Sequence, residues 1–225
     1  VNNQEHRRMT INAVVDRRAL HEIYLRGFEI AVRGAQPWTV MGAYNRLNGT
    51  YCCEHPLLLK ELLKEGWGYD GLVVTDWGAL NDKVRAMAAG LDLEMPGTDN
   101  GNDEILVEAV RSGALKEDVL DRAVGRVLEM VLRAERTLSE DYVYNADAHH
   151  ALARDVVREA AVLLKNNART LPLSEQSRVA LLGAFAKSPR YQGAGSSTMN
   201  PSRLDTLYDE LLEIAGEEAI AYAPG

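Results

Sequence analysis

The sequence predicts an α/β fold, in which a parallel sheet with covering helices is followed by the start of a second α/β domain. Strand-like and helix-like segments alternate at roughly 25 to 30 residues per unit, the spacing of parallel sheets. The run Leu72-Val73-Val74 is apolar and rich in β-branched residues between two glycines, as expected for a strand buried on both faces. A closed eight-stranded barrel takes about 250 residues, so a barrel here would need further strands upstream of Val1.

The first elements follow from hydrophobic spacing and turn residues. Residues 12–33 carry apolar side chains at three- and four-residue steps, which predicts a helix of about five turns closed by Gly34. A short strand is expected over 39–43, followed by a tight Asn-Gly turn at 48–49. Residues 56–66 are then expected to form a helix, with proline at its favoured first position and glycine at its end.

The segment 71–75 is the next expected strand, and it leads into a second helix. Asn81 or Asp82 is expected to cap this helix, which runs to Ala89 before a glycine breaks it. One more strand is predicted over 91–95, because Pro-Gly follows it directly. Two helices complete this part of the chain, over 102–112 and 116–135.

A polar segment, 137–148, separates the two parts of the chain. It shows neither the helical nor the strand period and is expected to be a linker. After it we expect a helix over 148–164, a strand over 179–182, a helix over 203–215 and a strand over 218–223. This order predicts the beginning of a second α/β domain.

The composition favours a globular protein with neutral ligands. Its net charge of -8 arises from 33 acidic and 25 basic residues without long runs of one sign, which argues against nucleic acid or an anionic membrane surface as partner. Apolar residues make up 46% of the chain and can fill a core. No apolar run approaches the roughly 20 residues that span a bilayer, so we expect no membrane span.

The two cysteines, Cys52 and Cys53, are adjacent and could bridge each other only through a strained ring. No second Cys or His pair at ligand spacing completes a tetrahedral site, so we expect small buried side chains and no metal. Reduced cysteines favour a cytoplasmic location. Because both ends of the sequence look cut, the lack of a signal peptide does not argue against secretion.

Asp76 is the leading candidate for catalysis. It directly follows the buried strand, and residues just past the carboxyl end of a barrel strand line the substrate mouth. Trp77 comes next, and a carboxylate beside a large aromatic side chain suits a sugar ring with hydroxyls and an apolar C–H face. The alternative is a helix cap or a turn residue, although Asp82 is available for that task.

Three other segments carry polar or glycine-rich patterns. The string 2–8 is dense in hydrogen-bonding groups, which a solvated loop would also explain. Tyr44 and Asn45 end the strand over 39–43, where the phenol could donate toward the ligand of Asp76 or be satisfied in the core. The glycine-rich turn 193–197 lacks the helix and lysine that phosphate binding requires.

Six short motifs occur in one order along nearly the whole chain. They are Asn2-Asn3-Gln4-Glu5 with Arg8, Met41-Gly42-Ala43-Tyr44-Asn45 with Asn48-Gly49, Trp67-Gly68-Tyr69-Asp70-Gly71, Val74-Thr75-Asp76-Trp77-Gly78-Ala79, Gly90-Leu91-Asp92-Leu93-Glu94-Met95-Pro96-Gly97, and Val162-Leu163-Leu164-Lys165-Asn166. Together they resemble the β-glucosidases of glycoside hydrolase family three.

This resemblance implies a (β/α)8 barrel followed by an α/β sandwich. Residues 1–136 would then be the C-terminal part of the barrel domain, 137–148 a linker, and 149–225 the N-terminal part of the sandwich domain. It also implies retaining hydrolysis of a β-glucoside or oligosaccharide substrate, with release of terminal β-D-glucosyl residues and without a cofactor.

The resemblance also implies roles for individual residues. Asp76 matches the catalytic nucleophile, and Trp77 lines the subsite of the sugar that is cleaved. Tyr44 lies near the nucleophile and helps to orient it. Met41 matches a residue of the pocket wall. Arg8 matches an arginine that hydrogen-bonds sugar hydroxyls, and Ser196 matches a serine that the second domain contributes to the site.

The chain also departs from the family pattern. A Lys-His pair and a sugar-binding Asp that precede the first motif are absent, and the acid/base Glu of the family comes from beyond Gly225. We assign that role to no acid here and expect Glu94 to be structural. Three alternatives remain: a β-xylosidase or another exo-glycosidase of this family, a non-catalytic carbohydrate-binding fragment, and a nucleotide-binding protein using 193–197. The missing groups would come from the rest of the same polypeptide or from a homo-oligomer.

Overall fold

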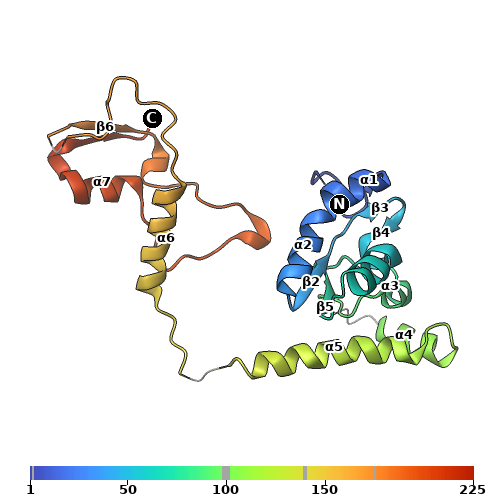
Figure 1. Cartoon of the computed structure of the whole chain (residues 1–225). Helices are drawn as coiled ribbons and strands as arrows, with labels where there is room; N and C mark the ends of the chain where they lie inside the picture. Colours follow the sequence, from blue (N-terminus) through green and yellow to red (C-terminus); the bar gives the residue numbers. More distant parts are fainter. Residues whose placement is uncertain (2, 98–101, 139–140, 175) are drawn as a thin grey trace. The chain divides into compact units, whose positions relative to one another are not determined.

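The computed structural model describes residues 1–225 except 2, 98–101, 139–140 and 175. The chain forms two compact units, Val1–Glu140 and Asp141–Gly225, and the division falls inside the segment expected to be a linker. Figure 1 labels the main helices and strands of each unit. Both units combine helices with parallel strands, as the predicted α/β class requires. Among the described residues, no helix has both the length and the apolar character needed to cross a bilayer.

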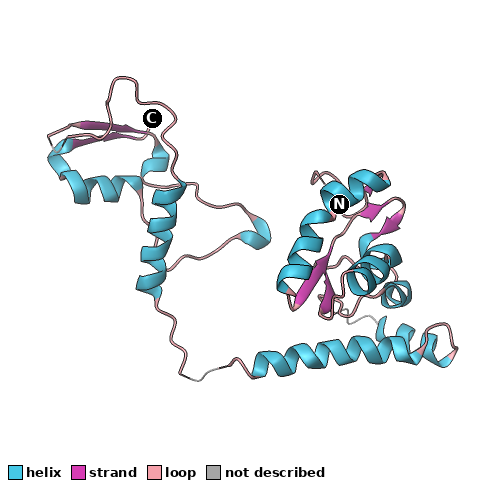
Figure 2. Ribbon diagram, in the orientation of Figure 1, coloured by secondary structure: helices cyan, strands magenta, loops and turns pink. Residues whose placement is uncertain are grey.

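Two parallel strands form the sheet that carries the candidate site. Strand β2 (Thr39–Gly42) pairs with β5 (Leu72–Thr75) from Thr39 opposite Leu72 to Gly42 opposite Thr75. Both strands were predicted, and Figure 2 shows them side by side in the first unit. Because parallel strands point the same way, the residues that follow Gly42 and Thr75 emerge at one edge of the sheet.

A second small sheet contains β1 (Asn12–Ala13), β3 (Arg46–Leu47) and β4 (Thr50–Tyr51). Strands β3 and β4 are antiparallel, and the two residues between them, Asn48 and Gly49, have φ values of 49° and 96°. Positive φ at both central residues is the requirement of a two-residue hairpin turn, and Asn-Gly meets it best. The predicted turn is confirmed.

The helix expected over 12–33 begins later. Asn12 and Ala13 pair with β3 instead, and Asp16 then caps the helix by accepting from the backbone N–H of Ala19 at 2.9 Å. The end also differs, because Gln36, in the left-handed region at φ 45°, terminates it in place of Gly34. The helical turns are α1 (Arg17–Ala19), η1 (Leu20–Tyr24) and α2 (Arg26–Ala35).

The other helices of the first unit agree closely with expectation. Asp82, of the two candidates, caps α3 (Lys83–Ala89) by accepting from the Arg85 N–H at 2.9 Å, and Gly90 ends it at φ 109°. The other predicted helices are η3 (Leu57–Gly66), α4 (Asn102–Arg111) and α5 (Glu117–Glu135), and a short turn that was not predicted is η2 (Cys52–Glu54). The main apolar core packs between η3, α3 and β5, and its buried residues are Val32, Leu59, Leu63, Tyr69, Val73, Ala86 and Leu91.

The strand expected over 91–95 is reduced to one parallel bridge between Val74 and Leu93. The side chain of Asp92 interrupts the ladder, because its carboxylate accepts from the Val73 N–H at 2.9 Å. The Val73 carbonyl in turn accepts from the N–H groups of both Asp92 and Leu93, each at 3.0 Å. One residue therefore faces two, as in a β-bulge, and regular pairing stops.

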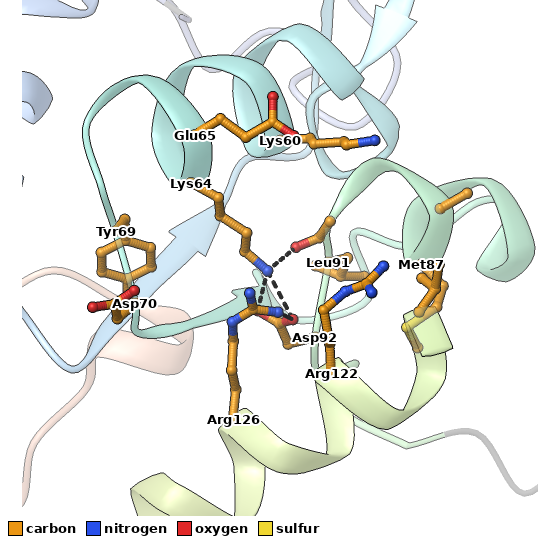
Figure 3. A pocket seen from close by; sticks show the side chains of 13 residues that line it. Lys60, Lys64, Glu65, Tyr69, Asp70, Met87, Leu91, Asp92, Arg122 and Arg126 are labelled. Carbon is orange, nitrogen blue, oxygen red and sulfur yellow. Dashed lines mark hydrogen bonds and ion pairs between the residues drawn. The ribbon is translucent and has the colours of Figure 1, made fainter. Parts of the chain in front are cut away.

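Asp92 is also the centre of a buried cluster of charges (Figure 3). Lys64 Nζ lies 2.8 and 2.7 Å from its two carboxylate oxygens, and Arg126 Nη1 lies 3.0 Å from Oδ1. The Asp92 side chain is 1% exposed and that of Lys64 10%. These side chains line a cavity of about 480 Å³ and tie η3, α5 and β5 together.

The second unit has a parallel pair of strands, β6 (Val179–Leu182) and β7 (Ile220–Ala223), with helices α6 (Ala146–Ala160) and α7 (Leu207–Ala215). The helix expected over 148–164 ends early, since Ala161 is extended at ψ 126° and the contiguous apolar run that follows lacks helical spacing. The helix expected from 203 starts late, because Thr206 caps it by accepting from the Asp209 N–H at 3.1 Å.

Candidate active site

The candidate site lies where β2 and β5 end. The backbone pairing continues one step beyond the strands, because the Asp76 N–H donates to the carbonyl of Gly42 at 2.9 Å. This bond sets Asp76 beside the residues that follow β2, among them Tyr44. The buried strand therefore delivers a carboxylate, which is itself half-buried, to the carboxyl edge of the sheet.

Two hydrogen bonds fix one oxygen of this carboxylate. Asp76 Oδ1 lies 3.0 Å from the Tyr44 hydroxyl and accepts from the Trp77 N–H at 2.6 Å. The Tyr44 hydroxyl also lies 2.9 Å from the Trp77 carbonyl oxygen. These two bonds hold the carboxylate of Asp76 in one orientation at the edge of the sheet.

The phenol of Tyr44 remains a donor over a wide pH range. Burial, together with the hydrogen bond to Asp76 and its negative charge, raises the pKa of Tyr44 above the usual value of 10.0, and the charge of Arg8 partly opposes this. The guanidinium of Arg8 lies over the Tyr44 ring, 5.0 Å from its centroid, and pairs with Glu5 at 2.9 Å. A cation thus lies against the phenol ring whose hydroxyl contacts Asp76.

The structure brings together four of the six predicted site residues, Arg8, Tyr44, Asp76 and Trp77. Trp77 is 65% exposed and leaves a broad aromatic surface open beside the carboxylate. Met41 is exposed on β2 opposite Val74, three residues before Tyr44. Ser196 lies in the second unit, exposed on the short turn η5 (Gly195–Ser197), so its relation to Asp76 stays a prediction.

Two residues support the site in a way that was not expected from the sequence. Thr75, buried directly before Asp76, both donates to the Met95 carbonyl at 3.1 Å and accepts from the Met95 N–H at 2.9 Å. The sequence feature that could have indicated Thr75 is a hydroxyl side chain at the end of an otherwise apolar strand. The other is Cys53, whose thiol fills the space beside Gly42 and donates to the Ala43 carbonyl at 3.6 Å.

Both cysteines are buried, as expected, and neither is disulfide-bonded. Burial, with smaller contributions from the neighbouring acidic groups, raises the pKa of Cys53 to about 12, so its sulfur is a thiol and a poor metal ligand at neutral pH. Within the described parts of the chain, no three His, Cys, Asp or Glu side chains gather in a way that could hold a metal ion.

Replacing Gly42 with alanine is expected to destabilise the first unit by about 1–3 kcal/mol, because the new methyl group would overpack the core. It would stand 2.6 Å from Cys53 Sγ and within 3.8 Å of that residue's Cα. Urea unfolding followed by tryptophan fluorescence measures the loss. Adding Cys53→Ala should recover part of it, whereas Gly27→Ala, with open space around it, should not destabilise. Equal effects at both glycines would contradict the close contact.

Comparisons with known proteins agree with this geometry. Residues 4–130 match the description "Glycosyl hydrolase family 3 N terminal domain", and residues 161–223 match "Glycosyl hydrolase family 3 C-terminal domain". The thermostable beta-glucosidase B of Acetivibrio thermocellus is 52% identical over the whole chain, and an exo-alpha-(1->6)-L-arabinopyranosidase of Bifidobacterium longum is 39% identical. The chain spans 30% of the length of each of these two relatives.

Solved structures show the same likeness. The GH3 beta-glucosidase of Bifidobacterium adolescentis is 39% identical with a TM-score of 0.90, over 100% of this chain and 32% of that one. Beta-glucosidase 3B of Thermotoga neapolitana in complex with glucose is 37% identical with a TM-score of 0.88, over 99% and 32%. Since the N-terminal family domain alone matches more than half of the residues, the chain belongs to glycosyl hydrolase family 3.

Proposed function

We propose that the whole protein containing this chain is a retaining glycoside hydrolase that removes terminal β-D-glucosyl residues, with Asp76 as nucleophile. The observation that carries this proposal is the Asp76 carboxylate at the end of β5, bonded to the Tyr44 hydroxyl and bordered by exposed Trp77. Two relatives named as beta-glucosidases, one of them in complex with glucose, support the substrate class.

In the proposed first step, a carboxylate oxygen of Asp76 attacks the anomeric carbon as the glycosidic C–O bond breaks. A carboxylic acid supplied from beyond this chain gives its proton to the leaving oxygen. In a retaining mechanism the two carboxyl groups are about 5 to 5.5 Å apart. In the second step the same group removes a proton from water, and the resulting hydroxyl displaces Asp76. The bonds from Tyr44 and Trp77 engage Oδ1, so Oδ2 is the freer oxygen for attack.

The rest of the polypeptide would complete the barrel of which β2 and β5 form a part. Among the described strands, β2 pairs with β5 alone, so the other edge of β2 is free to pair with a further strand. An apolar groove beside β2 would be covered in the same way, and its lining includes Phe28, Val40, Met41, Leu58 and Trp67. A second copy of the chain is the other candidate for this surface.

The proposal is tested on the full-length protein with a panel of nitrophenyl glycosides, including β-glucoside, β-xyloside and α-L-arabinopyranoside. We expect β-glucoside to give the highest kcat/KM. A 2-deoxy-2-fluoro glucoside should then leave its sugar on the peptide that contains Asp76, as seen by mass spectrometry. Labelling of another carboxylate would refute the role of Asp76, and a preference for arabinopyranoside would follow the other named relative.

Replacing Tyr44 with phenylalanine is expected to lower kcat by about 10- to 100-fold, because it removes one donor from the nucleophile and keeps the ring under Arg8. Steady-state kinetics on the β-glucoside measures this. The raised pKa of Tyr44 keeps its proton in place below about pH 10, so the pH profile of the variant should not change shape there. Tyr24→Phe is the control, since its hydroxyl meets Asn3 at 2.6 Å instead.

A further inference from the structure

The loop that carries Asp76 is held from two sides. Tyr44 and Gly42 hold it on the side of β2, as described above. On the other side the Met95 carbonyl accepts from the Gly78 N–H at 2.9 Å and from the Thr75 hydroxyl at 3.1 Å. The backbone of Met95 therefore fixes the chain both before and after the carboxylate.

The residue before Met95, Glu94, forms an ion pair that is largely shielded from solvent. The Glu94 side chain is 10% exposed, and its Oε2 lies 2.9 Å from Nζ of Lys83, which is 13% exposed. Oε2 has no hydrogen-bond partner among the described residues, so this ion pair is what compensates its charge. Lys83 also reaches Oδ1 of Asp103, an exposed side chain, at 2.6 Å.

Lys83 is well placed to act as an anchor. It is the first residue of α3, and the cap of this helix, Asp82, donates its backbone N–H to the buried carboxylate of Glu54 at 2.9 Å. Burial would lower the pKa of Lys83, but the neighbouring carboxylates of Asp103 and Glu94 outweigh it and raise the pKa, so the ammonium stays charged. The start of α3 is thus held by Glu54 and carries the charged ammonium that pairs with Glu94.

We infer that Lys83 and Glu94 are a positioning pair for the nucleophile: they hold the Met95 backbone, which holds Thr75 and Gly78 on either side of Asp76. This inference rests on the proposed function of Asp76. Neither side chain is given a chemical step. A misplacement of about 1 Å at a reacting group can cost about 100-fold in rate, so loosening this pair should lower kcat while sugar binding persists.

The test uses the full-length protein with Glu94→Gln and Lys83→Met, both of which remove the charge pair while keeping most of the side-chain volume. We expect kcat to fall by about 10- to 100-fold and KM to change by less than about threefold. Lys83→Arg keeps the positive charge and should restore most of kcat. Asp103→Asn, which removes the exposed partner of Lys83, is the matched control and should leave kcat unchanged.

Hydrogen exchange provides a readout that does not depend on turnover. The Gly78 amide should exchange faster in Glu94→Gln and Lys83→Met than in the unsubstituted protein. In Asp103→Asn its exchange rate should stay the same. Unchanged kcat, or unchanged exchange across residues 76–79 with only a lower Tm, would overturn the positioning role. If the unsubstituted protein hydrolyses no glycoside, the proposed function fails, and exchange alone decides whether the pair holds the loop.

Discussion

Replacing Asp76 with alanine in the full-length protein is expected to lower kcat for a nitrophenyl β-glucoside by at least about 1,000-fold, with little loss of stability. The reason for the large effect is that a nucleophile forms the covalent bond of the first step and no neighbouring group replaces it. Stability changes little because the half-buried side chain loses only its bonds with Tyr44 and Trp77. That loss should stay within about 0.5–1.5 kcal/mol.

Azide makes this prediction sharper. In the alanine variant the anion can enter the space of the carboxylate and attack the anomeric carbon, so it should restore part of the turnover and give a glycosyl azide of inverted configuration. Asp118→Ala is the control, because Asp118 is exposed and pairs only within its helix, with Arg122 at 2.7 Å. Rates like those of the unsubstituted protein in the Asp76 variant would end the nucleophile assignment.

The parts of the fold that follow from local chemistry could be predicted from the sequence. The buried run of β5, the Asn-Gly turn at 48–49, and the cap of α3 at Asp82 each depend on residues within one element. The position of Asp76 beside Tyr44 was also within reach, because two parallel strands that end together place their next residues at one edge.

The features that sequence reasoning missed depend on residues far apart in the chain. Asp92 was counted as part of a strand, but its carboxylate meets Lys64, 28 residues away, and Arg126, 34 residues away. No local period indicates such a cluster. The start of the first helix was misplaced for a similar reason, because the pairing of Asn12 and Ala13 with β3 outweighs the helical spacing.

Replacing Asp92 with asparagine is expected to destabilise the first unit by about 3–5 kcal/mol, since it leaves the cations of Lys64 and Arg126 without their anion in a buried site. Urea unfolding measures the loss selectively through tryptophan fluorescence. All three tryptophans, Trp38, Trp67 and Trp77, lie in the first unit.

Asp118→Asn is the matched control for this substitution. It also neutralises an Asp that pairs with an arginine of α5, but its partner Arg122 and the carboxylate are both exposed, so the change should stay within about 0.5 kcal/mol. If the two asparagine variants lose equal stability, the buried charge cluster does not make the expected contribution to the stability of the first unit.

A double-mutant cycle and a pH series separate the cost of an unpaired charge from the value of the pair. The double variant Lys64→Met/Asp92→Asn should lose less stability than the sum of the two single losses, by about 0.5–3 kcal/mol, because it removes both members of the ion pair.

Burial lowers the pKa of Lys64, and Asp92 opposes this, so the pKa must fall further in Asp92→Asn. The unfolded state then holds more protons than the native state, so the stability of the variant should rise with pH up to the ordinary pKa of lysine, about 10.4. Two results together would show that Asp92 acts through its bond to Val73 and not through its charge: stability losses of the two single variants that simply add, and a stability loss of Asp92→Asn that stays the same at high pH.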